Sequence, residues 1–501
     1  MSKRSDTGGV NRRSVLMGLG AGTAGLTTLS AAEAALLPNG HRTEKHDVIV
    51  VGMGMAGSAA ALQAKLAGAD VAVLDKMPES RTGGNSRLAG GLFITPRDDT
   101  AAAKKEYFDG LVKQTLGRGN TDVFRLMMDH SAEGIAWLKE QGADFNPMAP
   151  EPPFPVGSYT VKPGLFRGMP ILLRTLRQRF TSLGGKVIFD TKAAQLIMDN
   201  MGRVAGVRAL AADGVVDYMA SAVIITAGGY AGNRYILEEF IGPNADAMMV
   251  RGAKWATGDG LQMAQEAGAG VAGMAGVASL HVAAVSPKEP AAGQPGNGIP
   301  WFLGINRDGK RYVDESRGYV AHGKAALNQP GAQVALIFDS EIAKISEGPQ
   351  IAIAAFNNVH LPIVRADTLE ELAGKIGAPP AALVATVNEF NAAVKDGKAL
   401  DANPPKATLA FKVQTPPFYA FYPLVPGITL TFGGMMINTD AQVTQTDGRV
   451  ISGLYGAGEN AGAVYYDDYI GGGSLTNCLV MGRIAGRHAA QLSGHVAKAE
   501  K

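Results

Sequence analysis

Residues 47–57, DVIVVGMGMAG, join an apolar run to a glycine turn. The apolar run is typical of a buried strand, and an alanine-rich helical pattern continues from the turn to about Leu66. Glycines in the G-x-G-x-x-G spacing let backbone N–H groups and a helix N-terminus approach a pyrophosphate. A second apolar run, residues 71–74, ends on Asp75, at about the interval expected for a carboxylate that binds a ribose. These features predict a Rossmann-like βαβ unit that binds a dinucleotide.

The composition excludes several classes of protein. Over 501 residues, 47 Lys and Arg balance 45 Asp and Glu, so the net charge of +2 gives no electrostatic reason to expect a nucleic-acid partner. The single cysteine, Cys478, excludes intramolecular disulfides, Cys-ligated iron–sulfur clusters and C-x-x-C-H haem attachment within this chain. Redox chemistry therefore requires an organic cofactor, and we predict no metal site.

Residues 1–34 have the pattern of a twin-arginine signal peptide. Arg12 and Arg13 precede a mildly apolar stretch rich in glycine and alanine, which ends at residues 32–34, AEA, a small-x-small cleavage site. A transmembrane anchor is the alternative, but residues 15–37 contain four glycines and Glu33. We therefore expect a periplasmic protein, exported by the twin-arginine route, with no integral membrane segment after processing.

The remaining chain is predicted to be α/β, with one discontinuous domain and one inserted domain. Strand and turn signals give way to Pro-rich turns at about residues 275–431 and return at residues 453–459. We assign the dinucleotide-binding domain to residues 47–280 and 431–495. An α+β cap domain is predicted at residues 281–430.

Several motifs occur together in one order along the chain. They are the glycine turn, RTGGNS at 81–86, TGDG at 257–260, NRDGKRY at 306–312, FGGM at 432–435 and GLYGAGE at 453–459. With these motifs, the chain from about Asp47 to Gln491 resembles the FAD-dependent fumarate reductase and succinate dehydrogenase flavoprotein superfamily. The resemblance implies an FAD-binding domain and a substrate held between the flavin and the cap.

The resemblance also implies which residues hold FAD. Asp75 should bind the adenosine ribose, and Asp259 and Glu459 lie in family FAD-binding motifs. A helix cap or an ion pair with arginine is the alternative for those two carboxylates. Asn85 stands where some members attach FAD through a histidine, so we expect non-covalent FAD. The predicted FAD-binding residues are Gly52, Gly54, Met55, Ala56, Gly57, Asp75, Lys76, Gly83, Gly84, Asn85, Ser86, Gly90, Gly91, Ala193, Ala227, Gly228, Asp259, Glu459, Ser474 and Leu475.

The residues expected at the substrate differ from those of fumarate reductases. Those enzymes place a histidine before T-M-G-G, an arginine before L-G-G-N, and a further arginine in the cap. Leu430 and Tyr469 stand at the first two places, and Tyr319 stands at the third unless a two-residue offset brings in Arg317. Losing these cations removes charge-assisted hydrogen bonds worth about 1.5–3 kcal/mol each. Fumarate and succinate are therefore poor substrate candidates.

Two branches of the superfamily share features with this chain. The spacing of Tyr465, Tyr469 and Gly473 is similar to that of 3-ketosteroid dehydrogenases. His281, together with residues 312–315, 328–331 and 338–339, looks like the tricarballylate dehydrogenases. The first resemblance implies that Tyr469 and the Gly473 N–H hold a carbonyl oxygen while Tyr319 exchanges the α-proton. Tyr465 and Tyr469 could instead be packing aromatics.

We predict an FAD-dependent oxidoreductase that acts on a CH–CH bond next to the carbonyl of a cyclic, ketosteroid-like ketone, in either direction. A tricarballylate-like polycarboxylate dehydrogenase is the alternative enzyme, and a non-catalytic flavin electron-transfer protein is the alternative class. Because the chain offers no haem or iron–sulfur ligands, its electron partner must be external: a quinone, a soluble carrier or oxygen.

The signal peptide can be tested directly. N-terminal sequencing of the protein from its native host should give a start near Ala35. Changing Arg12 and Arg13 to lysine should leave the precursor in the cytoplasm, because the arginine pair is the export signal. A mature protein that retains Met1 would contradict the interpretation.

Overall fold

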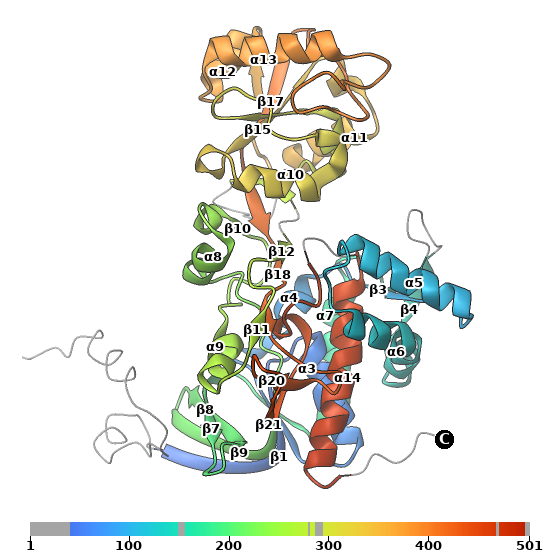
Figure 1. Ribbon diagram of the computed structural model, residues 1–501, viewed down its shortest axis with the longest axis vertical. Coiled ribbons are helices and arrows are strands. Elements are labelled where there is room, and N and C mark those ends of the chain that lie inside the picture. The colour runs from blue at the N-terminus through green and yellow to red at the C-terminus, as the bar shows by residue number, and fades with distance from the viewer. Residues whose placement is uncertain (1–40, 149–155, 279–280, 286–293, 467–469, 496–501) are drawn as a thin grey trace, which may run out of the picture.

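The computed structural model describes residues 41–148, 156–278, 281–285, 294–466 and 470–495. The predicted signal peptide lies outside these residues. The described chain has a mixed α/β fold, in which a large sheet and a second, smaller sheet each have their own hydrophobic core (Figure 1).

The large sheet is built around β1 (His41–Val51). β1 pairs in parallel with β2 (Val71–Leu74) on one side and with β9 (Gly214–Ile225) on the other. β6 (Lys186–Ile188) continues the parallel order beyond β2, and β21 (Val450–Gly456) continues it beyond β9. Residues 48–50 and 71–74 are buried on both faces of the sheet, which explains why both runs are continuously apolar.

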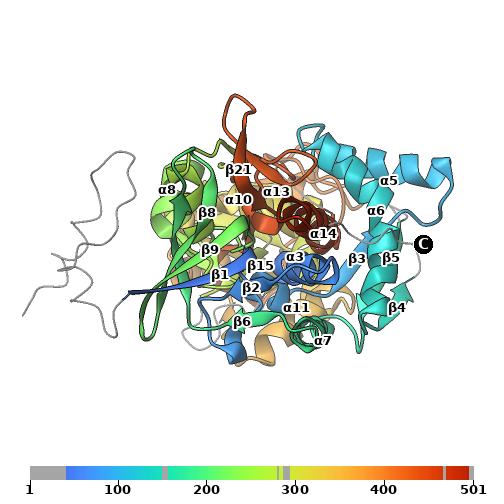
Figure 2. The ribbon, with the colours of Figure 1, turned by 90° about the horizontal axis from the view of Figure 1, so that it is seen from below.

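Two helices from opposite ends of the chain pack on one face of this sheet (Figure 2). They are α3 (Met55–Leu66) and α14 (Gly473–Leu492). A Cβ atom at Gly482 would lie 2.5 Å from the Ala56 carbonyl oxygen, and one at Gly486 would overlap the Ala60 carbonyl. The two helices can approach this closely only because α14 carries glycine at both contacts.

The other elements of this part of the chain flank the sheet. β8 pairs antiparallel with β9 and β7 with β8, β20 pairs antiparallel with β21 at the end of the strand order away from β6, and β3, β5 and β4 form a separate small sheet. Their bounds are α4 (Gly84–Leu88), β3 (Leu92–Thr95), α5 (Ala101–Gln114), α6 (Thr121–Glu140), β4 (Phe145–Met148), β5 (Gly157–Val161), α7 (Gly168–Ser182), β7 (Lys192–Met198), β8 (Val204–Ala211), α8 (Arg234–Ile241), α9 (Asp259–Glu266), β11 (Val271–Ala272), β12 (Val277–Ala278), β18 (Leu430–Thr431), β19 (Gly434–Met435) and β20 (Gln442–Thr444).

The second sheet is organised by the long strand β17 (Phe418–Ile428). Its order is β10-β17-β15-β14, and β13 and β16 also pair with β17. The strands are β10 (Met249–Val250), β13 (His281–Ala284), β14 (Leu303–Asn306), β15 (Val334–Asp339) and β16 (Val364–Ala366), and the helices around them are α10 (Gly318–Leu327), α11 (Gly348–Asn357), α12 (Leu369–Lys375) and α13 (Pro380–Ala393). β10 falls in the segment assigned to the FAD-binding domain, yet it pairs with β17, because this long strand reaches back to the first part of the fold.

None of the helices in the described ranges is long and apolar enough to cross a membrane.

A buried group of charges links the elements of the second sheet. The Glu315 carboxylate, which has no exposed surface, accepts hydrogen bonds from Arg311 Nη2 at 2.8 Å and from the Gly304 N–H at 2.9 Å. The Lys406 ammonium lies 3.8 Å from the same carboxylate and donates to the Phe302 carbonyl. Burial lowers the pKa of Lys406 to about 8. Glu315 is therefore the counter-ion that two buried cations share.

We predict that Glu315→Gln lowers the free energy of unfolding by about 3–5 kcal/mol, because it leaves buried cations without a counter-ion. Chemical denaturation followed by circular dichroism would measure the loss. Glu371→Gln is the matched control, since Glu371 pairs with Lys375 on the surface of α12. Equal losses for the two variants would contradict the prediction.

Candidate functional site

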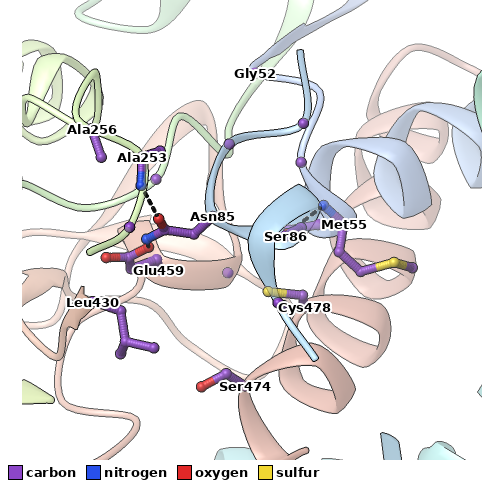
Figure 3. Close-up of a pocket in the computed structure, with 18 of the residues that line it drawn as sticks. Gly52, Met55, Asn85, Ser86, Ala253, Ala256, Leu430, Glu459, Ser474 and Cys478 are labelled. Atoms are coloured by element: carbon purple, nitrogen blue, oxygen red, sulfur yellow. Dashed lines mark hydrogen bonds between the residues drawn. The ribbon is translucent and has the colours of Figure 1, made fainter. Parts of the chain in front are cut away.

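A cavity of about 570 Å³ opens at the carboxyl ends of β1, β2 and β9 (Figure 3). This is where ligands bind in open α/β sheets. Its wall is assembled from segments far apart in the sequence, and they include residues 51–56, 74–76, 83–86, 88–92, 165–166, 191–193, 226–228, 251–253, 255–256, 429–432, 458–459, 464–465, 471–472, 474–475 and 477–478. The cavity reaches the first turns of both α3 and α14.

The glycine turn forms one wall of the cavity. Gly52 has φ +97°, and a Cβ atom there would lie 2.7 Å from the Thr226 carbonyl oxygen. A Cβ at Gly57 would overlap the Gly52 carbonyl. The Met55 N–H donates to Ser86 Oγ at 3.0 Å, which joins this turn to α4. The N-terminal turn of α3 thus faces the cavity with its positive dipole end, as phosphate binding requires.

Asp75 follows β2 and is tied to the turn. Its carboxylate accepts hydrogen bonds from the Met53 N–H at 3.2 Å, the Thr82 hydroxyl at 2.6 Å and the Met77 N–H at 2.9 Å. Two ionised carboxylate oxygens offer about four acceptor positions, so one remains for a ligand hydroxyl.

Asp259 is held by two lysines. It lies 2.5 Å from Lys76 Nζ and 3.1 Å from Lys192 Nζ. Burial acts to raise the pKa of Asp259, but the hydrogen bonds and charges of both lysines outweigh it, and the pKa lies below its usual value. The carboxylate therefore both lines the cavity and pairs with two of its cations, so the three groups together keep one positive charge.

Asn85 ties four segments together beside the cavity (Figure 3). Its amide nitrogen donates to Glu459 Oε2 at 2.8 Å and to the Thr429 carbonyl at 3.1 Å, and its oxygen accepts from the Ala253 N–H at 2.6 Å. Glu459 also accepts from the Thr431 N–H at 3.0 Å. Burial raises the pKa of Glu459, while the hydrogen bonds from Thr431 and Asn85 act in the opposite direction.

The wall of the cavity has the features of a cradle for an elongated polar ligand. Gly84, at φ +53°, and Gly228, at φ +81°, would carry a Cβ with no heavy atom within 4 Å, and both line the cavity. Ser474 Oγ, on the first turn of α14, is buried without a hydrogen-bond partner in the described part of the chain. These residues fit FAD, with donors for its phosphates at α3 and a polar contact at α14.

The cavity brings most of the predicted FAD-binding residues together. Every residue of that set lines it except Gly57, which lies behind the turn against Gly52. The role of each residue toward FAD stays a prediction. Cys478 also lines the cavity, and burial raises the pKa of its thiol to about 12, so this cysteine is a neutral wall residue at pH 7.

The predicted catalytic residues are only partly brought together. Tyr465 is buried and lines the cavity, and a Cβ at Gly473 would lie 3.0 Å from its hydroxyl. The Gly473 N–H donates to the Ile470 carbonyl at 2.9 Å, so in this structure it is not directed at a substrate carbonyl as expected.

The backbone elements of two other predicted catalytic residues can be given, and one further residue is exposed. His281 begins β13, and Tyr319 is the second residue of α10. The Arg317 side chain is exposed and does not line the cavity. Tyr469 lies outside the described residues.

Several polar and aromatic residues of the wall were not predicted from the sequence, among them Lys192, Arg251, Trp255 and Gln294. Arg251 and Trp255 precede the TGDG motif, but no spacing rule marks them. Among the described residues no cluster of His, Cys, Asp or Glu could hold a metal ion.

Comparison with known proteins gives consistent results. A family model described as FAD binding domain matches residues 47–475. The chain is 32% identical over 386 residues to a protein named NADH:acrylate oxidoreductase from Vibrio harveyi; this alignment covers 75% of the chain and 37% of the relative, so the chain spans little more than a third of that protein.

Two solved structures extend the comparison. The open conformation of a flavocytochrome c3 fumarate reductase has a TM-score of 0.74 at 26% identity, covering 98% of this chain and 83% of that one. The structure of a 3-ketosteroid-Δ4-(5α)-dehydrogenase from Rhodococcus jostii RHA1 has a TM-score of 0.69 at 26% identity. The alignment covers 89% of this chain and 97% of that one. The resemblance inferred from the sequence motifs is confirmed.

Gly57→Ala should strip FAD from the protein. The added methyl group would overlap the Gly52 carbonyl and displace the first turn of α3, and overpacking of this kind costs about 1–3 kcal/mol. Flavin content per protein after gel filtration, read from absorbance, checks the outcome. Gly374→Ala is the control, because this helical glycine in α12 has open space around it. Full flavin content in Gly57→Ala would refute the role given to the turn.

Proposed function

Because the chain belongs to the FAD binding domain family and is an FAD-dependent oxidoreductase, we propose that it adds hydrogen to, or removes it from, a carbon–carbon bond next to a carbonyl group. FAD, when bound, supplies or accepts the hydride. The observation that carries the proposal is the wall beyond Asn85, where Leu430, Phe432 and Tyr465 present a mainly apolar surface with one hydroxyl.

The first turn of α14 supports this chemistry. A helix of 20 residues carries a partial positive charge at its N-terminus, and Ser474 and Leu475 place that end on the cavity. Negative charge that develops on a ligand beside this turn is stabilised by the oriented N–H groups. The unpaired Ser474 hydroxyl is a further donor at the same place.

Tyrosines are proposed to act on the substrate. Tyr469 would polarise the carbonyl with Tyr465 beside it, and Tyr319 would exchange the α-proton, with Arg317 as the alternative and His281 as an auxiliary polar group. An unperturbed tyrosine has a pKa about three units above pH 7, which corresponds to roughly 4 kcal/mol. A nearby cation or a proton relay must supply that difference. Because the Gly473 N–H is engaged by Ile470, its part in holding the carbonyl requires that bond to open or be shared.

The proposed substrate is a cyclic ketone rather than fumarate. Leu430 lies on the cavity where fumarate reductases carry a histidine, so one of their carboxylate contacts is replaced by an apolar side chain. A tricarballylate-like polycarboxylate is the second candidate. We place the enzyme in the periplasm, as a cap-covered flavoprotein that exchanges electrons with a quinone, a soluble carrier or oxygen.

Anaerobic titration of the oxidised protein with saturated cyclic ketones, keto acids and polycarboxylates tests the proposal. A substrate should bleach the flavin absorbance, whereas a purely electron-transferring flavoprotein would respond to none of them.

Tyr469→Phe should slow flavin reduction by the best substrate about 10²–10³-fold, because it removes one donor to the developing oxyanion. Tyr319→Phe should lose about 10²–10⁴-fold and abolish exchange of the α-proton with deuterated solvent. Tyr235→Phe, on the surface of α8, is the control. Wild-type rates in both tyrosine variants, together with an inactive Arg317→Ala variant, would contradict the prediction and assign the proton-transfer role to Arg317.

A further inference from the structure

The charges on the cavity wall are unevenly compensated. Among the described residues, the cations that line it are Lys76, Lys192 and Arg251. Both lysines pair with Asp259. Arg251 forms no side-chain hydrogen bond or ion pair with any described residue, so no group in this part of the chain compensates its charge.

Arg251 is also partly removed from water. Its Nε atom is buried without a hydrogen-bond partner in the described chain, which leaves the terminal nitrogens as the donors for a ligand. Burial lowers the pKa of Arg251 to about 10, so the side chain is still cationic at pH 7. A desolvated cation without a counter-ion is costly, and an anionic ligand group would offset that cost through charge-assisted hydrogen bonds.

The backbone holds Arg251 in one place. Its N–H donates to the Ile428 carbonyl at 2.8 Å, where β10 runs beside the end of β17. Two residues later, the Ala253 N–H binds Asn85 Oδ1. In Figure 3 the Asn85 side chain points toward Ala253 and Glu459 and away from Met55 and Ser86, the turn that fits the phosphates of FAD. Arg251 thus belongs to the part of the wall that includes Leu430, on the substrate side.

We propose that Arg251 is a specificity-determining residue that binds a carboxylate of the substrate. The proposal rests on the proposed function and narrows it to substrates that carry one carboxylate besides an apolar body. The planar guanidinium can hold a carboxylate through two parallel hydrogen bonds. Besides Arg251, the cations among the described wall residues are the two lysines paired with Asp259, so a second carboxylate near Leu430 would find no unpaired cation there, which disfavours dicarboxylates.

The test measures binding to the oxidised, FAD-loaded protein, so it does not depend on turnover. Isothermal titration calorimetry would compare 4-oxocyclohexanecarboxylate with its uncharged amide, and 3-phenylpropanoate with its amide. The wild-type protein should bind each acid more tightly than its amide. Arg251→Gln should weaken acid binding roughly 10- to 100-fold and leave the amides unchanged, because only the charge-assisted bonds are lost.

Two further variants test whether acid binding depends on the paired donors of the Arg251 guanidinium, on its charge alone, or on the net charge of the protein. Arg251→Lys should keep part of the preference, since a lysine retains the charge but not the paired donors. Arg234→Gln, an exposed arginine at the start of α8, removes the same charge away from the cavity and should change nothing.

The outcomes are distinct. Equal binding of acids and amides by the wild-type protein would overturn the proposal. So would a loss of FAD affinity in Arg251→Gln with the acid preference intact, because Arg251 would then serve the cofactor phosphates. Preserved acid preference in the wild-type protein alongside a flavin that no compound bleaches would instead count against the proposed reaction and leave the carboxylate site standing.

Discussion

The structure depends on the contact of Gly57 with the Gly52 carbonyl at the start of α3. Because no side chain intervenes, α3 begins directly against the carboxyl ends of β1 and β9. α14 then packs on α3 through Gly482 and Gly486, and this contact sets where the first turn of α14 meets the cavity. Two helix N-termini therefore face one space, and the site has two regions suited to negative charge.

The local parts of this arrangement were predictable from the sequence. The strand, turn and helix of residues 47–66 follow from apolar periodicity and glycine spacing, which are properties of neighbouring residues. The hydrogen bonds of Asn85 to Ala253 and Glu459 were not predictable, since these residues are 168 and 374 positions away from Asn85 in the sequence. Arg251 was missed for a related reason: the absence of a partner is a property of the folded wall, and a sequence contains no sign of it.

Charge compensation divides the cavity into two regions. On the dinucleotide side, Asp259 pairs with both lysines, and Asp75 supplies a second carboxylate to the same wall. The wall beyond Asn85 holds Arg251, which has no ion-pair partner among the described residues, together with apolar side chains and a tyrosine hydroxyl. The sequence motifs describe the first region well because cofactor contacts rely on backbone geometry, whereas the second region is shaped by individual side chains whose partners are set only by the fold.

The position of Asn85 has a mechanical consequence. Two stretches that leave the second sheet, residues 251–253 after β10 and residues 428–430 at the end of β17, lie side by side, and Asn85 binds the backbone of both. Because the same side chain also binds Glu459, displacing either stretch would break hydrogen bonds that hold the other. The arginine and the leucine of these stretches are therefore fixed to each other and to α4, at the base of the second sheet and apart from α12 and α13 at its far end (Figure 1).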